Sequence, residues 1–306
     1  MKEYIFPCVV IRTKETELLS KDEFLKLSEQ KTVLDILKII RNNGYGEGEE
    51  ATNPRDFERI LKENMEETYE LIYSVIPGES DLDFFKLPSD YHNLKAILKA
   101  EFSDQDPREL LLKSGTVEPD ELMDYVRKRE MNMLPLEMGE AVLEAIELFG
   151  KSGDPQEIDI RLDRACYKQM LESAEASGSD FLVNYAGNTI DLINISTFIR
   201  LRETGRPKSF FDRVFLDGGN ILESDIEAVA IDIVGKVTVS GLEKYVDDQK
   251  MEYVREAIYV PFGFEPIVGF IQAKETEWKN LRIILAGKLA GMPEDKIRER
   301  LRDTYV

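Results

Sequence analysis

Histidine and cysteine are scarce in this sequence of 306 residues. It has one histidine, His92, and two cysteines, Cys8 and Cys166. A single imidazole excludes every zinc site that needs two, including the HExxH motif of zinc proteases. Two cysteines make no disulfide framework, so we expect a protein of a reducing compartment such as the cytosol.

Positive charge is also in short supply. Forty Lys and Arg residues stand against 60 Asp and Glu, which gives a formal net charge of −20. Nucleic-acid binding needs a basic surface, so this charge argues against a nucleic-acid partner. No uninterrupted apolar run approaches the ~20 residues of a membrane-spanning helix, and the opening residues lack the pattern of a signal peptide. With 42% hydrophobic residues, the chain is still able to bury a substantial core.

Helical spacing of apolar residues dominates the sequence. It predicts helices over Phe57–Val75, Glu140–Phe149, Asp159–Ala174 and Ser224–Val239. Only Ile5–Ile11 has an extended pattern, and its Pro7 disfavours a central strand. Strands and helices do not alternate along the chain, which disfavours a doubly wound sheet. The predicted fold class is therefore all-α.

Three segments share one pattern: an acid, an asparagine three positions later, and apolar residues one, four and five positions beyond the asparagine. The acid, the asparagine and the first apolar residue are Asp90, Asn93 and Leu94 in the first copy, Asp191, Asn194 and Ile195 in the second, and Glu277, Asn280 and Leu281 in the third. On a helix, the apolar positions share one face and the asparagine lies at its edge. A neutral asparagine can hydrogen-bond neighbouring backbone there at a lower desolvation cost than a charge. The pattern therefore indicates packing rather than catalysis, since asparagine transfers no proton at neutral pH.

The middles of these apolar stripes are predicted core residues. They are Ile97, Leu98, Phe198, Ile199, Ile284 and Leu285. A second element follows the first two copies, because Leu112–Leu122 matches Leu216–Ile226 as a helix end, a glycine stop, a short turn and an acidic helix start. The segment Leu18–Phe24 fits the same role, with Ser20 and Glu23 as a capping box. The chain is thus predicted to contain about three helical units.

Sequence motifs for catalysis or for binding a nucleotide are weak. The Gly287-Lys288 pair resembles a phosphate-binding loop, but Arg282 and Leu289 stand where that loop needs glycine and Ser or Thr. His92 lies within a helical repeat and has no evident catalytic partner, so a surface or capping role is favoured. Cys166 is predicted to be a small buried hydrophobic residue. The residues by themselves indicate a non-enzymatic helical scaffold that binds no nucleotide, cofactor or metal.

The C-terminal stretch adds a family resemblance. Phe262–Val306, with Glu265-Pro266, Glu277-Trp-Lys-Asn280 and the ending Tyr305-Val306, resembles the end of the C subunit of V-type and A-type ATPases, which is called d in eukaryotes. Upstream, the segments around Asn93 and Asn194 and the segment Leu18–Phe24 resemble recurring blocks of that family in the same order. The resemblance covers nearly the whole chain.

The resemblance implies a funnel-shaped body of three similar helical domains around a pseudo-threefold axis. The expected domains are 1–107, with the C-terminal helix 292–306 packing near it, 108–208 and 209–306. Such a protein is a non-catalytic, peripheral rotor part on the cytoplasmic face of the membrane. It joins the shaft subunits of the central stalk to the membrane ring of proteolipid subunits, and so couples ATP hydrolysis or synthesis to H⁺ or Na⁺ transport.

The resemblance supplies no catalytic, cofactor or metal residues, and it assigns no residues to the interfaces with shaft and ring. Two alternatives remain open. A stand-alone α-helical adaptor would show the same repeats, and co-purification with membrane ATPase subunits would separate it from a rotor part. An enzyme that uses the carboxylate-rich surface is the other alternative, and metal-dependent thermal stabilisation would support it.

Overall fold

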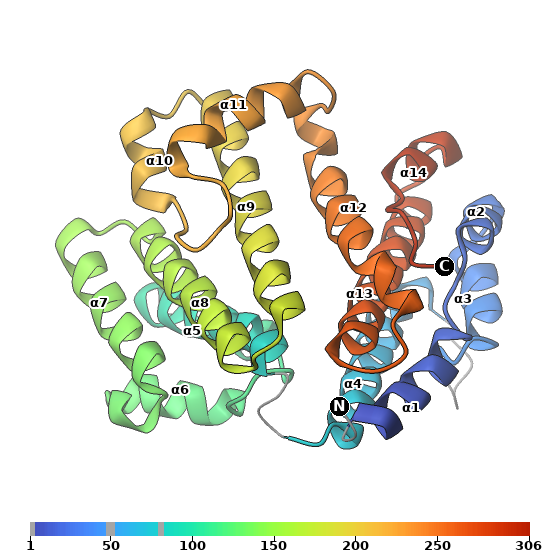
Figure 1. The fold of residues 1–306 in the computed structure, drawn as a ribbon, viewed down its shortest axis with the longest axis horizontal. Coiled ribbons are helices and arrows are strands. Elements are labelled where there is room, and N and C mark those ends of the chain that lie inside the picture. The colour runs from blue at the N-terminus through green and yellow to red at the C-terminus, as the bar shows by residue number, and fades with distance from the viewer. Residues whose placement is uncertain (1–3, 47–52, 79–82) are drawn as a thin grey trace. The chain divides into compact units, whose positions relative to one another are not determined.

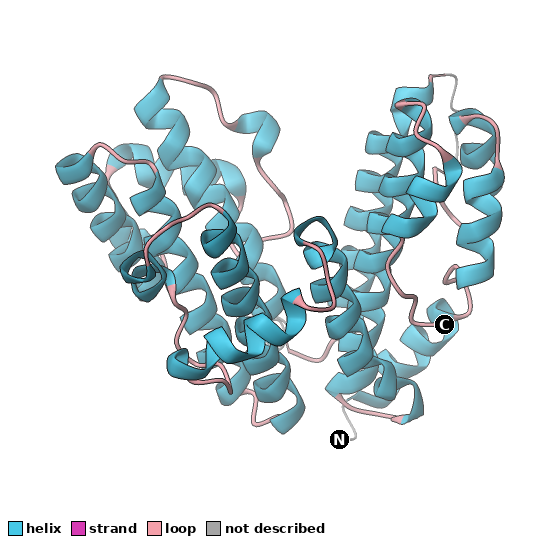
Figure 2. Cartoon of the chain, turned by 90° about the horizontal axis from the view of Figure 1, so that it is seen from above, coloured by secondary structure: helices cyan, strands magenta, loops and turns pink. Residues whose placement is uncertain are grey.

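The computed structural model describes residues 4–46, 53–78 and 83–306. All regular structure in these ranges is helical, and they contain no strand (Figure 2). The all-α prediction is therefore confirmed for the described part of the chain. The contacts divide the chain into two compact units. Unit 1 consists of Met1–Pro77 and Lys236–Val306, and unit 2 of Gly78–Gly235.

Unit 1 is built around its longest helix, α13 (Phe264–Leu289). Helix α13 packs against α1 (Ile5–Glu15), α2 (Lys21–Glu29), α3 (Val33–Arg41), α4 (Phe57–Val75), α12 (Leu242–Arg255) and α14 (Glu294–Arg300) (Figure 1). Most residues of α13 are buried, as expected for a helix with neighbours on all sides. Its Leu281, Ile284 and Leu285 lie in one core with Phe24 of α2 and Ile36 of α3.

Unit 2 is centred on α8 (Gln156–Ala176). The other α-helices described in this unit are α5 (Asp83–Ser103), α6 (Pro119–Lys128), α7 (Leu136–Ser152), α9 (Asp180–Glu203), α10 (Lys208–Val214) and α11 (Glu223–Val234). Helix α8 packs against α5, α7, α9 and α10, while α6 contacts α5 and α11 contacts α9. Its Ile158, Leu162 and Cys166 are buried in the core of the unit.

The helices predicted from apolar spacing are confirmed, with one boundary changed. Phe57–Val75 is α4, and the predicted segments 140–149 and 159–174 lie within α7 and α8. The segment Ser224–Val239 is helical only to Val234, where α11 ends. Beyond that point Gly235 and Lys236 form a turn, and the β-branched residues Val237 and Thr238 lead into a short 3-10 helix, Val239–Gly241.

The prediction of an extended segment at Ile5–Ile11 is wrong, because these residues belong to α1. Pro7 is the third residue of the helix, where a backbone N–H has no intrahelical partner, so the proline costs no hydrogen bond. Pro7, Cys8 and Ile11 are buried, and α1 packs on α13 and α4. Burial in the unit therefore outweighs the local preference of the β-branched residues for an extended backbone.

The predicted capping box at the start of α2 is confirmed. The Ser20 hydroxyl accepts a hydrogen bond from the backbone N–H of Glu23, and the Glu23 carboxylate accepts one from the backbone N–H of Ser20. The Ser20 hydroxyl also donates to this carboxylate over 2.7 Å. Together these bonds hold the pKa of Glu23 below its ordinary value and fix the direction in which the chain enters α2.

Helices α9 and α13 have 24 and 26 residues, which is long enough to cross a bilayer. Neither these two nor any other helix in the described ranges is apolar enough over such a length to be a membrane span.

Candidate functional site

The three copies of the acid–asparagine pattern all lie within long helices, on α5, α9 and α13. Their polar residues are buried: Asp90, Asn93, Asp191, Asn194, Glu277 and Asn280 are each at most 6% exposed. The apolar residues that follow each asparagine, Leu94, Ile195 and Leu281, are buried as well. Buried polar side chains need hydrogen-bond partners, so these partners decide what the pattern does.

Each asparagine holds one residue of a distant loop by both of its backbone groups. Asn93 accepts a hydrogen bond from the N–H of Leu112 and donates one to its carbonyl, both over 2.8 Å. Asn194 makes the same pair of bonds with Leu216, over 2.8 and 2.9 Å. Asn280 makes the pair with Arg302, over 3.2 and 2.8 Å. The side-chain amide thus satisfies both the N–H and the C=O of that residue, as a neighbouring strand would in a sheet.

The first two acids hold the same loops a few residues further on. Asp90 accepts hydrogen bonds from the backbone N–H groups of Thr116 and Val117, and Asp191 accepts them from those of Asn220 and Ile221. All four bonds are between 2.8 and 3.2 Å long. We call each acid with its asparagine a clamp. In these two copies the two side chains of the clamp fix both ends of one loop.

The glycines of these loops leave room for the clamps. A Cβ atom on Gly115 would lie 2.1 Å from Oδ1 of Asp90, and one on Gly219 would lie 2.2 Å from Oδ1 of Asp191. Neither glycine has a positive φ angle. Both were expected to be helix stops. The first loop does follow a helix end, that of the short 3-10 helix Arg108–Leu110, and the second follows the end of α10, but Leu111 and Phe215 cap these helices rather than the glycines. The glycines are needed for steric room and not for backbone conformation.

The third acid, Glu277, reaches a different part of the chain. It accepts a hydrogen bond of 2.6 Å from the backbone N–H of Leu19, in the loop before α2, and one of 2.5 Å from the Tyr45 hydroxyl. Lys274 donates to the same carboxylate over 2.6 Å and lies 4.8 Å from the centre of the Tyr45 ring. Burial, and then the charge of Glu277, keep the pKa of Tyr45 well above its ordinary value, so the tyrosine stays a donor.

Burial of the apolar stripes is confirmed at five of six predicted positions. Ile97, Leu98, Ile199, Ile284 and Leu285 are buried. Phe198 is only half-buried and packs edge-to-face on Phe211, with ring centroids 5.1 Å apart. The prediction that Phe198 lies in the core is therefore wrong.

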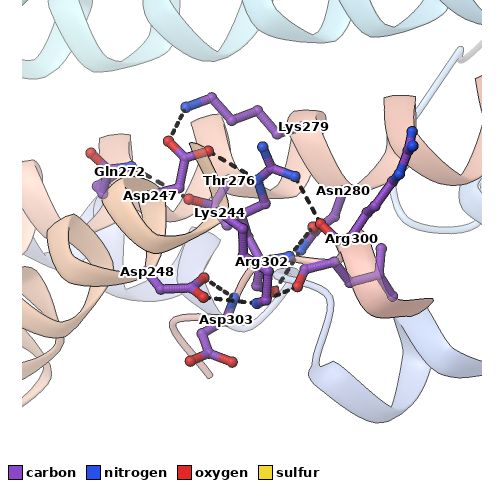
Figure 3. Close-up of polar contacts among 11 residues, drawn as sticks. Lys244, Asp247, Asp248, Gln272, Thr276, Lys279, Asn280, Arg300, Arg302 and Asp303 are labelled. Atoms are coloured by element: carbon purple, nitrogen blue, oxygen red, sulfur yellow. Dashed lines mark hydrogen bonds and ion pairs between the residues drawn. The ribbon is translucent and has the colours of Figure 1, made fainter. Parts of the chain in front are cut away.

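The residues after α14 form an extended tail, 301–306, which a set of charged side chains holds (Figure 3). Asp247 of α12 lies between two cations: Lys279 donates to one of its oxygens over 2.7 Å, and Arg302 to the other over 2.9 Å. Burial alone would raise the pKa of Asp247, but Lys279 and Arg302 outweigh it and hold the pKa below its ordinary value. Asp247 is therefore ionised in the folded protein at neutral pH.

The neighbouring residues of α12 hold the backbone of the tail. Asp248 accepts a hydrogen bond of 2.7 Å from the N–H of Asp303, and Lys244 donates one of 2.6 Å to the carbonyl of Leu301. Arg255 donates to the carbonyl of Thr304 over 2.9 Å. We call Lys244, Asp247, Asp248 and Arg255 the clasp. Charge-assisted bonds of this kind are stronger than neutral ones, so the tail is bound over most of its length.

Unit 1 also contains a polar pocket of about 610 Å³. Lys14, Asn42, Asn64 and Lys274 are among the residues that line it. Both lysines are already bound to carboxylates, Lys14 to Glu17 and Lys274 to Glu277. The hydroxyls of Thr16 and Thr68, which also line it, donate to the backbone carbonyls of Thr13 and Asn64.

The remaining chemical candidates occupy structural positions. His92 is exposed, and its Nε2 lies 3.0 Å from the carbonyl oxygen of Leu110. Cys8 and Cys166 are buried, and burial raises the pKa of both thiols, which makes them poor nucleophiles. Gly287 lies inside α13, where a Cβ would come within 2.8 Å of Ile297, so it makes room for α14. Within the described ranges, no group of three or more His, Cys, Asp or Glu residues could hold a metal ion.

The clamp residues follow a spacing that is visible in the sequence, whereas the residues of the clasp do not. Lys274 stands three positions before Glu277, a spacing that predicts an ion pair on one helix face. Asp247 and Arg302 are 55 residues apart, and no local spacing relates them.

Comparison with known proteins gives a match over nearly the full length. Residues 7–300 match the family described as ATP synthase (C/AC39) subunit. The chain is 24% identical over 318 residues to the C subunit of the V-type sodium ATPase of Enterococcus hirae, with 97% of both chains covered. It is 22% identical over 338 residues to the C subunit of the A-type ATP synthase of Methanosphaera stadtmanae, covering 97% of this chain and 87% of that relative.

Proposed function

Because the chain belongs to the C/AC39 subunit family of V-type and A-type ATPases, we propose that it is the non-catalytic rotor subunit of such a complex. In this role it joins the shaft subunits of the central stalk to the membrane ring of proteolipid subunits. It thereby couples ATP hydrolysis or synthesis to the transport of H⁺ or Na⁺. The family match over residues 7–300 carries the proposal, and the alignments with two relatives from ATPase complexes support it.

A spacer between shaft and ring is needed for a physical reason. A shaft built as a coiled coil and a ring of many equal subunits differ in symmetry, so they cannot match contact for contact. An intermediate body with one surface for each partner removes this mismatch, provided that it is stiff enough to transmit torque. The buried α13 and the clamps that tie loops to α5 and α9 support such stiffness.

The arrangement that we propose for this body is a funnel of three similar helical domains around a pseudo-threefold axis, which receives the foot of the shaft. The domains are 1–107, with the C-terminal segment 292–306 packing near it, 108–208 and 209–306. Only Glu294–Arg300 of that segment is helical, so the expected helix 292–306 is shorter than predicted. The matching backbone hydrogen bonds of Asn93, Asn194 and Asn280 support three related domains. Superposing the three asparagine-bearing helices should also superpose their neighbours.

The protein is proposed to act at the cytoplasmic face of the membrane as a peripheral protein. It has no catalytic residues in this role and binds no nucleotide itself, because the catalytic sites belong to other subunits. With a net charge of −20, polar and ionic contacts should dominate its exposed interfaces. Binding to shaft and ring should then weaken as salt screens these contacts.

Affinity purification from native membranes tests this assignment. The tag belongs at the N-terminus, since Tyr305 at the other end of the chain is buried. Shaft and proteolipid subunits, identified by mass, should co-purify at low salt and be lost as the salt concentration rises. Recovery of the protein alone, or only with soluble proteins unrelated to the ATPase, would contradict the rotor assignment and favour a stand-alone adaptor.

A further inference from the structure

Every clamp acid binds backbone just before the start of a short helix. Asp90 holds the N–H groups of Thr116 and Val117, shortly before α6 begins at Pro119. Asp191 holds those of Asn220 and Ile221 shortly before α11. Glu277 holds the N–H of Leu19 shortly before α2. The loop before α2 is thus bound by Glu277 in the way that the loops before α6 and α11 are bound by Asp90 and Asp191.

The residues that follow agree with this correspondence. Val117, Ile221 and Leu19 are each followed five positions later by a buried apolar residue of the short helix. These residues are Leu122, Ile226 and Phe24, with exposures of 0%, 0% and 2%. The match therefore extends from the loop into the helix that it starts.

The third clamp differs in how its loop is assembled. In the first two copies, the asparagine and the acid bind one continuous loop, Leu112–Val117 and Leu216–Ile221. In the third copy, Asn280 binds Arg302 in the tail, while Glu277 binds Leu19 at the other end of the chain.

We propose that the third repeat element is split between the two ends of the chain. The tail 301–306 supplies the first half of its loop, and the segment 18–24 supplies the second half with the following helix. Unit 1 is therefore closed by a binding site for the chain's own C-terminal peptide. This inference concerns only the closure of unit 1 and does not depend on the rotor role.

The two halves meet where a continuous loop would run. Leu18 and Leu19 line a crevice of about 10 Å³ together with Thr304, Tyr305 and Val306. An ion pair between Lys21 and Asp303, 3.6 Å long, also joins the two segments. A space of this size is too small for more than about one water molecule, so the ends abut.

The third copy has a tyrosine, Tyr305, where the first two copies have Gly115 and Gly219. When Arg302 is aligned with Leu112 and Leu216, Tyr305 falls at the position of Gly115 and Gly219. In the first two copies, the aspartate occupies the space that a Cβ would need. In the third copy, the longer Glu277 binds Leu19 instead, and the buried Tyr305 packs against Gly269 of α13.

The split has a mechanical consequence. The first two loops are continuous peptide, whereas no peptide bond joins the two halves of the third. The clasp and Asn280 hold the tail, Glu277 holds Leu19, and the ion pair of Lys21 with Asp303 joins the two segments. Loosening the tail should therefore loosen the segment 18–24, although the two lie at opposite ends of the sequence. An ordinary terminal tail would fray by itself and leave the rest of the unit protected.

Hydrogen exchange of the full chain, read by mass spectrometry, tests this coupling. Arg302→Gln removes the bond to Asp247, and we expect exchange at least about tenfold faster both in the tail and in peptides that cover 18–24. The matched control is Arg300→Gln. Arg300 lies two positions before Arg302 and its side chain is exposed, so this variant removes the same charge without removing the bond to Asp247. It should leave both regions at wild-type rates.

A second variant guards against misfolding of the first. Arg255→Gln loses only the bond to the Thr304 carbonyl and a surface ion pair, and we expect the same two regions to exchange faster. Faster exchange confined to the tail, with 18–24 at wild-type rates in both variants, would overturn the split element. Equal effects of Arg300→Gln and Arg302→Gln would overturn it too, because they would point to net charge alone.

Discussion

A single methyl group at Gly115 should break the first clamp. A Cβ there would lie 2.1 Å from Oδ1 of Asp90, so the carboxylate or the loop must move by about 1 Å to restore ordinary contact. Such a shift breaks the hydrogen bonds from Thr116 and Val117, which are 2.7 to 3.2 Å long. Hydrogen bonds to a buried charge contribute about 1.5–3 kcal/mol each, and they are not independent here. We therefore expect Gly115→Ala to lower the free energy of unfolding by about 3 kcal/mol.

Urea denaturation followed by circular dichroism measures this loss. Gly150→Ala is the matched control: Gly150 lies in α7 of the same unit with open space around it, so the change should stabilise by about 0.5–1 kcal/mol. In an Asp90→Ala background there is no carboxylate to displace, and Gly115→Ala should then cost less than about 1 kcal/mol. An equal loss in both backgrounds, or a loss under about 1 kcal/mol in the wild type, would refute the steric argument.

Three further predictions concern stability. Asn194→Ala leaves the buried N–H and C=O of Leu216 unpaired, so the free energy of unfolding should fall by about 3 kcal/mol. Asn280→Ala should lower it by less, because the tail that Asn280 binds can turn to solvent. Phe198→Ala should cost about 1–2 kcal/mol in urea denaturation, below the range for a fully buried phenylalanine, because Phe198 is half-buried. The pKa of Asp247 is lowered by folding, so its stabilisation is present above the ordinary value of 3.8 and is lost as pH falls through the folded value. Thermal unfolding between about pH 2 and pH 6 should show this loss in the wild type and less of it in Asp247→Asn.

Each of these predictions has an outcome that contradicts it. A larger loss for Asn280→Ala than for Asn194→Ala would mean that the tail is as constrained as an internal loop. A cost of about 3 kcal/mol or more for Phe198→Ala, the range for a buried phenylalanine, would place Phe198 in a closed core. Identical pH profiles for wild type and Asp247→Asn would show that Asp247 does not stabilise the clasp.

Local physics explains which features were predictable from the sequence. The helix Phe57–Val75 was predictable, because it depends on the spacing of its own apolar residues and on the nearby Pro77, which stops it. The capping box at Ser20 and Glu23 was also predictable, because it depends on two residues that are three positions apart. The acid–asparagine pattern also appeared in the sequence, since the same local spacing recurs in α5, α9 and α13.

Features that depend on tertiary contacts were not predictable. Ile5–Ile11 has a local preference for an extended backbone, but packing of α1 on α13 makes it helical. Glu277 binds Leu19, 258 residues away in sequence, and nothing in the spacing of either residue identifies the other. Phe198 follows the helical stripe, yet it is only half-buried and packs edge-to-face on Phe211. Local spacing gives the elements, whereas the partners of buried polar groups follow only from the packed fold.

The most direct test of the rotor assignment is to measure ATP hydrolysis and ion pumping in the same vesicles, with and without this protein. The complex that lacks it is reconstituted, and the purified full chain is added back as the control. We predict that hydrolysis persists without the protein, that pumping stops, and that adding the chain back restores pumping. Pumping at the full rate in its absence would contradict the claim that this protein couples the shaft to the ring.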